Sequence, residues 1–196
     1  SIDDYKNRKR FTKKKNGALL NLVFIGSVRY FEHQVKIINH LKDDHRFRMY
    51  FHGSGAELDI FIQYCKENKI QNVTFTGGYD NSDKYKLLKN ADLLNNSYKT
   101  SKFLEVKYAI SNKFYDGLIY GIPQLVETET YKQEKVEELE VGVGIDENDT
   151  GFADKLYNYY FNIDEDLFAL KSNEELGRIL SDEDKYSKKI KDFIYI

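Results

Sequence analysis

Apolar and polar positions alternate in blocks along this chain, and the blocks predict a repeating order of strands and helices. The first apolar run, residues 19–25 (LLNLVFI), is short and ends at Gly26, as expected of a buried parallel strand closed by a turn. Four apolar residues between positions 31 and 41 then recur at the spacing of one buried helical face. Further short apolar runs predict strands at residues 47–51, 73–76, 91–94, 122–127 and 141–145.

Helical patterns fill the gaps between these strands. Helices are predicted at residues 57–68, 80–90, 112–120 and 130–139, and from residue 149 onward with breaks near Asp164 and Ser181. Gly121 suits a left-handed helix cap, and Pro123 cannot continue the helix before it. Strands that alternate with helices predict the α/β class, as a Rossmann-like, doubly wound parallel sheet with helices on both faces.

The loops of such a sheet limit where a ligand can bind. Crossovers between parallel strands are right-handed, so the loops that follow the strands share one edge of the sheet. Ligands bind at that edge, near the point where the strand order reverses. The search for a site therefore reduces to five loops, at residues 26–30, 52–55, 77–80, 95–112 and 128–131.

The N-terminal part of the chain has a different character. Residues 6–15 (KNRKRFTKKK) are basic, with one aromatic residue and no helical or strand period. We interpret this segment as a solvated leader that adds little to the core; the alternative is a peripheral contact with acidic lipid head groups or a partner. The predicted organisation is a leader or interdomain linker at 1–18, a Rossmann-like domain at 19–163 and a helical extension of that domain at 164–196.

Composition narrows the class of protein. Of 196 residues, 41% are apolar and 32% charged, as in globular domains, and the net charge of −2 gives no case for nucleic-acid binding. The one cysteine, Cys65, excludes an internal disulfide and a cysteine-rich metal site, and its apolar neighbours predict a buried thiol. The sequence contains no apolar stretch of membrane-spanning length and no secretion signal, so we expect a cytoplasmic location.

The loop after the first strand has residues that could bind an anion. Gly26, Ser27 and Arg29 lie between a strand and a helix, where backbone amides and a guanidinium suit a diphosphate. The alternative is a solvated loop arginine. The strand is not followed by G-x-G-x-x-G, and the chain has no Walker A sequence, which disfavours dinucleotide oxidoreductases and P-loop enzymes.

The loop after the second strand is rich in small residues. Gly53 and Gly55 would let a ligand approach the backbone closely, and His52 could donate a hydrogen bond to a phosphate or a sugar. An ordinary strand-to-helix turn with a half-exposed histidine explains the same residues.

The most informative stretch is SNKFYDGLIYGIPQLV, at residues 111–126. Ser111 or Asn112 can cap a helix whose first free amides, up to Phe114, point at the ligand edge. Lys113 adds a charge there and is expected at the surface, so that its removal should barely change stability. Asp116 follows one turn later on the same helical face, where it could accept hydrogen bonds from hydroxyls. The alternative is a Lys–Asp surface pair on an ordinary helix.

This stretch resembles the donor-site helix and following strand of GT-B glycosyltransferases, whose usual form is roughly K-[FIL]-x-E-x-[LM]-A-x-G-x-P-V-[IV]. The match spans residues 113–126, with Asp116 where the family usually has glutamate. The surrounding order is similar too: Gly-Ser-x-Arg after the first strand, G-x-G after the second and Gly-Gly after the third. The resemblance covers about residues 19–160 and is to the C-terminal half of such enzymes.

The resemblance implies a function and assigns roles. The C-terminal half of these enzymes binds the nucleotide-sugar donor, most often a UDP-sugar, and typically needs neither metal nor cofactor. Arg29 and Lys113 would face the diphosphate, Asp116 the ribose hydroxyls, and Gly78 and Tyr79 the base. The acceptor, a glycan or lipid-linked saccharide of bacterial surface polysaccharide synthesis, would need an N-terminal domain or partner subunit. The chain alone is expected to bind the donor without transferring its sugar.

Several residues of this sequence differ from the family pattern, so other functions remain compatible with it. Retaining members usually carry Glu-x7-Glu, but Tyr108 and Asp116 stand at those positions, and Glu105 is out of register. Gln34 replaces a lysine that often follows the first-loop arginine. The stereochemistry of transfer is therefore left open. The alternatives are half of a sugar-nucleotide epimerase of the same fold, and a non-catalytic α/β module of flavodoxin or receiver type.

Overall fold

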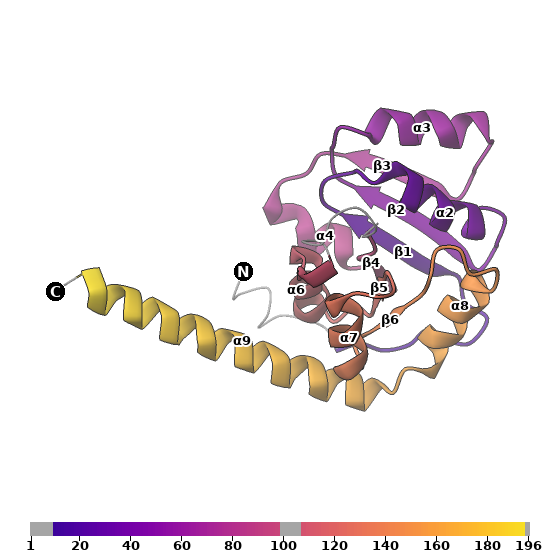
Figure 1. The fold of residues 1–196 in the computed structure, drawn as a ribbon. Helices are drawn as coiled ribbons and strands as arrows, with labels where there is room; N and C mark the ends of the chain where they lie inside the picture. The colour runs from indigo at the N-terminus through magenta and orange to yellow at the C-terminus, as the bar shows by residue number, and fades with distance from the viewer. Residues whose placement is uncertain (1–9, 99–106, 195–196) are drawn as a thin grey trace.

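The computed structural model describes residues 10–98 and 107–194, with side chains of the last helix described to residue 182 and at residue 185. Within these residues, six strands form one parallel sheet in the order β3-β2-β1-β4-β5-β6 (Figure 1). The strands are β1 (Leu20–Ile25), β2 (Phe47–His52), β3 (Val73–Gly77), β4 (Leu93–Asn95), β5 (Gln124–Val126) and β6 (Gly142–Gly144). The predicted fold class is confirmed, and the strand order reverses between β1 and β4.

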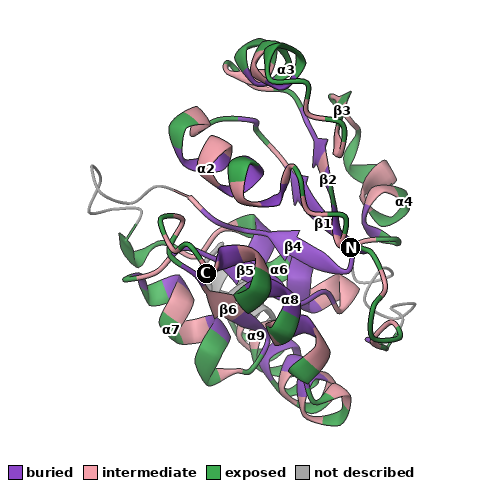
Figure 2. Ribbon diagram, turned by 90° about the vertical axis from the view of Figure 1, so that its right-hand side faces the viewer, coloured by how far each residue is buried: buried purple, intermediate pink, exposed green. Residues whose placement is uncertain are grey.

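Helices cover both faces of this sheet, as the alternation of side chains along β1 requires. Leu22 and Phe24 belong to the same core cluster as Ile38 of α2, whereas Val23 and Ile25 pack with Leu88 of α4. Figure 2 shows α2 and α4 on opposite sides of the buried strands. The helices are α2 (Phe31–Leu41), α3 (Leu58–Glu67), α4 (Lys84–Leu88) after the 3-10 turn η1 (Asn81–Asp83), α6 (Asn112–Tyr120), α7 (Tyr131–Glu138), α8 (Phe152–Asn162) and α9 (Glu165–Ile194).

The strand register brings together the loops that follow the carboxyl ends of the strands. Ile25 pairs with His52, and His52 pairs with Gly77, so β1, β2 and β3 end at one level. On the other side of β1, Asn95 of β4 pairs with Leu125 of β5. The loops that follow these strands therefore meet at the carboxyl edge, as the sequence predicted.

Two predictions about single residues are confirmed. Gly121 ends α6 in the left-handed conformation, with φ 65°, and its N–H bonds to the carbonyl of Gly117. Cys65 is buried on α3, and burial raises the pKa of its thiol to about 11.

The C-terminal helices match the prediction in part. The break near Asp164 is confirmed, because its carboxylate caps α9 by accepting from the N–H groups of Asp166 and Leu167, both at 3.0 Å. The predicted break at Ser181 is wrong, since α9 continues through it. Ser181 has no helix-breaking neighbour, and the pair of Arg178 with Asp182, at 3.2 Å, supports the helix there.

The prediction that the basic leader adds little to the core is wrong for residues 10–18. Phe11 is 8% exposed and contacts the rings of Tyr160 and Phe168, with centroids 5.8 and 4.9 Å away. Lys14 places its ammonium 2.6 Å from a carboxylate oxygen of Asp92. One aromatic residue in a basic run has no period to detect, yet it fills a gap between α8 and α9. Residues 1–9 lie outside the described part.

No helix in the described part of the chain is both long and apolar enough to cross a bilayer.

Candidate functional site

The first loop and the start of α6 meet at the carboxyl edge, where the sequence predicted a diphosphate grip. Lys113 is the second residue of α6, and its ammonium lies beneath the loop that follows β1. A Cβ placed on Gly26 would be 3.6 Å from Lys113 Nζ. With a φ of 125°, Gly26 adopts a conformation that side-chain-bearing residues rarely reach. A glycine here therefore keeps the approach to the lysine open.

Lys113 itself is buried, which corrects the expectation of a surface position. It is 7% exposed, donates a hydrogen bond to the Tyr98 hydroxyl at 2.7 Å, and lies 4.1 Å from the centre of the Phe24 ring. Among the described residues it forms no ion pair with a carboxylate. Burial, and then the nearby charge of Lys132, lower its pKa to about 7.

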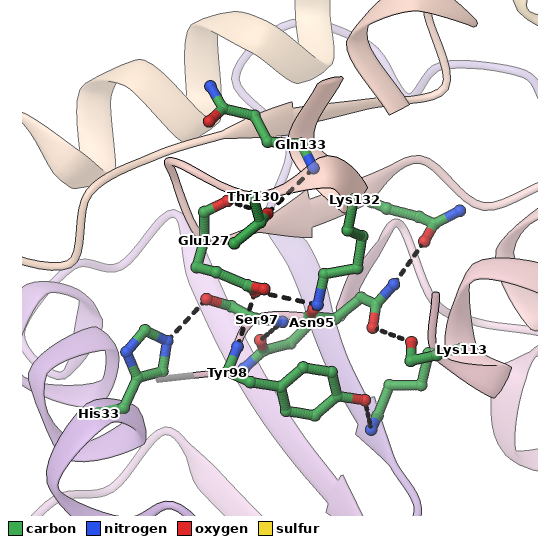
Figure 3. Close-up of polar contacts among 12 residues, drawn as sticks. His33, Asn95, Ser97, Tyr98, Lys113, Glu127, Thr130, Lys132 and Gln133 are labelled. Atoms are coloured by element: carbon green, nitrogen blue, oxygen red, sulfur yellow. Dashed lines mark hydrogen bonds and ion pairs between the residues drawn. The ribbon is translucent and has the colours of Figure 1, made fainter. Parts of the chain in front are cut away.

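A second buried lysine, Lys132, also contacts Tyr98 (Figure 3). Lys132 Nζ is 4.0 Å from the centre of the Tyr98 ring, 2.9 Å from Glu127 Oε2 and 2.5 Å from the carbonyl oxygen of Asn96. Burial lowers the pKa of Lys132 to about 8, although the carboxylate of Glu127 opposes this change. The second oxygen of Glu127, Oε1, is buried with no hydrogen-bond partner among the described residues.

The pair of Lys132 and Glu127 was not predicted from the sequence, although a signal was present. Glu127 directly follows a buried strand, at the edge where ligands bind. Lys132 lies on a helix that is otherwise mainly acidic, five residues later. Neither residue belongs to the motif on which the resemblance rests.

Asp116 lies on α6 one turn after Lys113, but the alternative Lys113–Asp116 surface pair does not form. Both carboxylate oxygens of Asp116 are instead 3.0 Å from Nζ of Lys84, the first residue of α4. Burial and then the charge of Asp116 raise the pKa of the Tyr79 phenol, so Tyr79 lies within electrostatic range of this carboxylate. Asp116 and Tyr79, two residues predicted to hold the nucleoside, therefore interact electrostatically.

Three other residues predicted to bind the ligand lie in different environments in this part of the site. Asn112 is exposed at the start of α6. Phe114 points into the core and its N–H bonds to the carbonyl of Ser111, so it contributes packing. Gly78 is exposed directly after β3, and a Cβ placed on it would lie 3.7 Å from the hydroxyl oxygen of Ser54.

The glycines of the second loop serve contacts within the protein. A Cβ on Gly53 would lie 1.8 Å from the carbonyl oxygen of Gly26, and one on Gly55 would lie 2.2 Å from that of Val28. The N–H of Val28 bonds to the carbonyl of Ser54 at 2.9 Å. The close approach that these glycines allow is therefore between the first and second loops.

Ser27 and Arg29 are exposed on the first loop, and the next residue is strained. The Arg29 guanidinium lies 5.0 Å from the centre of the Tyr30 ring. Tyr30 has a φ of 66°, which is rare for a bulky side chain, and its ring contacts Tyr98 edge-on at 5.5 Å. This geometry holds the first loop against the tyrosine that contacts both lysines.

His52 is turned away from these residues. Its Nδ1 is 2.9 Å from the Thr76 hydroxyl, and its ring stacks on Tyr50. It lines a cavity of about 660 Å³ under α4, together with residues such as Val23, Tyr50 and Ile122. Because α4 has only five residues, it leaves this face of β1 and β2 partly uncovered. None of the other predicted site residues lines this cavity.

Buried amides and a histidine brace the loop after β4. The Gln34 side chain donates to the carbonyl of Ser97 and accepts from Asn95, both at 2.7 Å. His33 Nε2 is 2.7 Å from the Ser97 hydroxyl, and burial lowers the pKa of His33 to about 4. These side chains are closed off from solvent, so they position the loop that carries Tyr98.

The chain is similar to known proteins in structure but not in sequence. No protein-family profile matches the chain, and no curated protein matches it in sequence. Several solved glycosyltransferases do match in structure. The apo form of WaaB, a lipopolysaccharide outer core galactosyltransferase, has a TM-score of 0.61 at 12% identity, over 82% of this chain and 46% of that one.

Two further matches were solved with a bound nucleotide. Pneumococcal GtfA, an O-GlcNAc transferase in complex with UDP and GlcNAc, has a TM-score of 0.60 at 12% identity, over 90% of this chain and 37% of that one. Anabaena HepE in complex with UDP has a TM-score of 0.60 at 13% identity, over 84% and 49%. This chain has the fold of a GT-B glycosyltransferase domain. It spans less than half the length of these three proteins.

The residues that depart from the GT-B pattern lie in different environments. Gln34, which replaces a lysine, is buried among the amides that brace the loop after β4. Tyr108, in the position of the first family glutamate, is exposed. Glu105 lies outside the described residues. Among the residues that are described, no three His, Cys, Asp or Glu side chains gather as metal ligands would.

Proposed function

We propose that this chain is the donor-binding half of a glycosyltransferase, and that it holds a nucleoside-diphosphate sugar at the carboxyl edge of its sheet. The observation that carries the proposal is the ammonium of Lys113. It is buried at the start of a helix, beneath an open glycine loop, without a carboxylate partner among the described residues. Rings and one hydroxyl compensate a buried charge poorly, and a diphosphate would supply the missing counter-charge.

The balance of charges around Lys113 supports an anionic ligand. Lys132, Arg29 and Lys84 all act on Lys113 to lower its pKa, while Asp116 acts to raise it. Glu127 and Asp116 are already paired with Lys132 and Lys84. The edge therefore has an excess of cations over carboxylates. The first amides of α6 add partial positive charge in the same place.

These groups suggest how the site would act. Lys113 and the helix amides would offset the charge that develops on the diphosphate leaving group when the sugar departs. Asp116 and Tyr79 would hold the nucleoside. We propose a UDP-sugar as the donor, supported by the UDP complexes of GtfA and HepE, and a reaction that needs no metal.

The acceptor would be bound elsewhere. Transfer needs donor and acceptor held in reacting geometry with water excluded, which two facing domains achieve. We propose a glycan or lipid-linked acceptor in bacterial surface polysaccharide synthesis, supported by the similarity to WaaB. The chain spans 46% of WaaB, so we propose that another domain or subunit binds the acceptor.

Calorimetric titration with UDP, UDP-glucose and flavin mononucleotide tests the proposal. We expect the first two to bind, with an affinity that falls as salt is added, and the flavin to bind no better than background. Lys113→Met should cost about 1.5–3 kcal/mol of UDP affinity, the value of a charge-assisted hydrogen bond. The control, Lys86→Met, changes an exposed lysine of α4 that pairs with Asp83.

Other outcomes favour the alternatives. Flavin binding without UDP binding would favour a flavodoxin-type module, and binding of none of the three would refute the proposed function. Conversion of UDP-glucose to an epimer by the chain would favour the epimerase.

A further inference from the structure

Lys84 is a residue that no sequence motif singles out, yet it contacts the proposed nucleoside site. It is the first residue of α4, and its side chain reaches across to α6. Its Nζ lies 3.0 Å from both Oδ1 and Oδ2 of Asp116. The Lys84 side chain is 22% exposed and that of Asp116 is 11% exposed. The pair is thus partly shielded, where geometry is better held than at an open surface.

An ammonium placed equally between two carboxylate oxygens has a directional effect. It occupies one acceptor position on each oxygen and fixes the plane of the carboxylate. Each oxygen keeps a further acceptor position on another side. These remaining positions lie on the outer sides of the two oxygens, so a hydroxyl that approaches from one side can donate to one of them. The 2′-hydroxyl of ribose is a donor of this kind.

We propose that Lys84 is a positioning residue that orients the Asp116 carboxylate to accept a hydrogen bond from the 2′-hydroxyl of ribose. This inference rests on the proposed function, and it adds that the site selects ribonucleotides over 2′-deoxyribonucleotides. Lys84 acts through Asp116 and does not contact the hydroxyl itself. Its charge also adds to the field at Lys113, so its removal weakens diphosphate binding slightly in addition to the loss of selectivity.

The test compares three ligands on the whole chain by calorimetry: UDP, 2′-deoxyuridine diphosphate and methyl diphosphate. We expect the parent to prefer UDP over its deoxy form by about tenfold, the lower end of a hydrogen bond to a charged acceptor. In Lys84→Met the preference should fall to about twofold. Methyl diphosphate affinity should fall no more than about threefold, as for loss of one partly screened charge.

Two further variants separate orientation from charge and from folding. Lys84→Arg keeps a cation that can bridge both oxygens, and should restore the preference. Lys84→Gln keeps hydrogen-bond donors but has no charge, and should give an intermediate preference without a buried apolar side chain. Lys86→Met, which alters an exposed lysine on the same helix, should match the parent. Thermal unfolding of each variant reports whether it is folded.

Each result decides between the proposals. An unchanged ribose preference in Lys84→Met and Lys84→Gln overturns the inference, as does equal weakening of all three ligands. A parent that binds UDP and its deoxy form equally also overturns it, while the proposed diphosphate site stands. A parent that binds none of the three refutes the proposed function, and the inference with it.

Discussion

Replacing Lys113 with methionine should stabilise the fold while it weakens ligand binding. The pKa of Lys113 falls from 10.5 to about 7 in the folded chain, so folding disfavours its charged form by roughly 4–5 kcal/mol. Methionine fills a similar volume without a charge. It forfeits the contacts of the ammonium with the Phe24 and Tyr98 rings and with the Tyr98 hydroxyl, about 2 kcal/mol in all. We therefore expect a net gain of about 2–3 kcal/mol at pH 7.

The pH dependence of this gain provides a second check. Between pH 7 and 10.5 the unfolded chain holds more protons on Lys113 than the folded chain, so the stability of the parent rises with pH across this range. The penalty is fully present below pH 7 and is lost as the pH approaches 10.5. The advantage of Lys113→Met should therefore shrink by about 2 kcal/mol between pH 7 and pH 9.

Urea unfolding of the parent and the variant at both pH values measures these quantities. Other titrating groups are common to both proteins, so they cancel in the difference. Lys86→Met, at an exposed lysine, should leave stability within about 0.5 kcal/mol of the parent. A variant less stable than the parent at pH 7, or an advantage that does not change with pH, would refute the reasoning.

Three further predictions concern the site and the core. UDP-glucose has no phosphate proton to lose near neutrality, so the pH dependence of its affinity reports on the protein. Its affinity by calorimetry should be constant below about pH 7 and fall by up to tenfold per pH unit above it, because Lys113 loses its proton. A flat profile would argue against contact with Lys113. Lys132→Met leaves Glu127, which is 3% exposed, without its cation and should lower the free energy of unfolding in urea by about 3–5 kcal/mol. The double variant, Lys132→Met with Glu127→Met, should recover most of that loss. Additive losses in the double variant would contradict the pairing. Phe11→Ala should lower the free energy of unfolding by about 3 kcal/mol, because the Phe11 ring fills space between Tyr160 and Phe168. A loss under about 0.5 kcal/mol would mean that residues 10–18 add little to the core.

The elements of the sheet were predictable because each depends on its own residues. The run at residues 19–25 is apolar on both faces of a strand, and such a run needs helices on both sides whatever follows it. Gly121 and Pro123 end α6 by local backbone chemistry alone. The break predicted near Ser181 was wrong, because no residue near Ser181 has the local chemistry that breaks a helix.

The site was predictable only in its outline. The position of Lys113 on α6 follows from the motif, but its burial depends on Phe24 of β1 and on Tyr98 beyond β4, which come from distant parts of the sequence. The partner of Asp116, Lys84, lies 32 residues away on another helix. Sequence patterns fix which edge a residue occupies, whereas the side chains that cover it are set by packing between elements.

The two buried lysines differ in a way that bears on their roles. Lys132 has Glu127 beside it, a pair that can stand without any ligand. Lys113 has only rings and a hydroxyl among the described residues, and these compensate a buried charge poorly. A methionine at position 113 would satisfy the fold better than the lysine does. The lysine is therefore best explained by a charge that the folded chain alone does not supply, and an anion beneath the Gly26 loop would supply it.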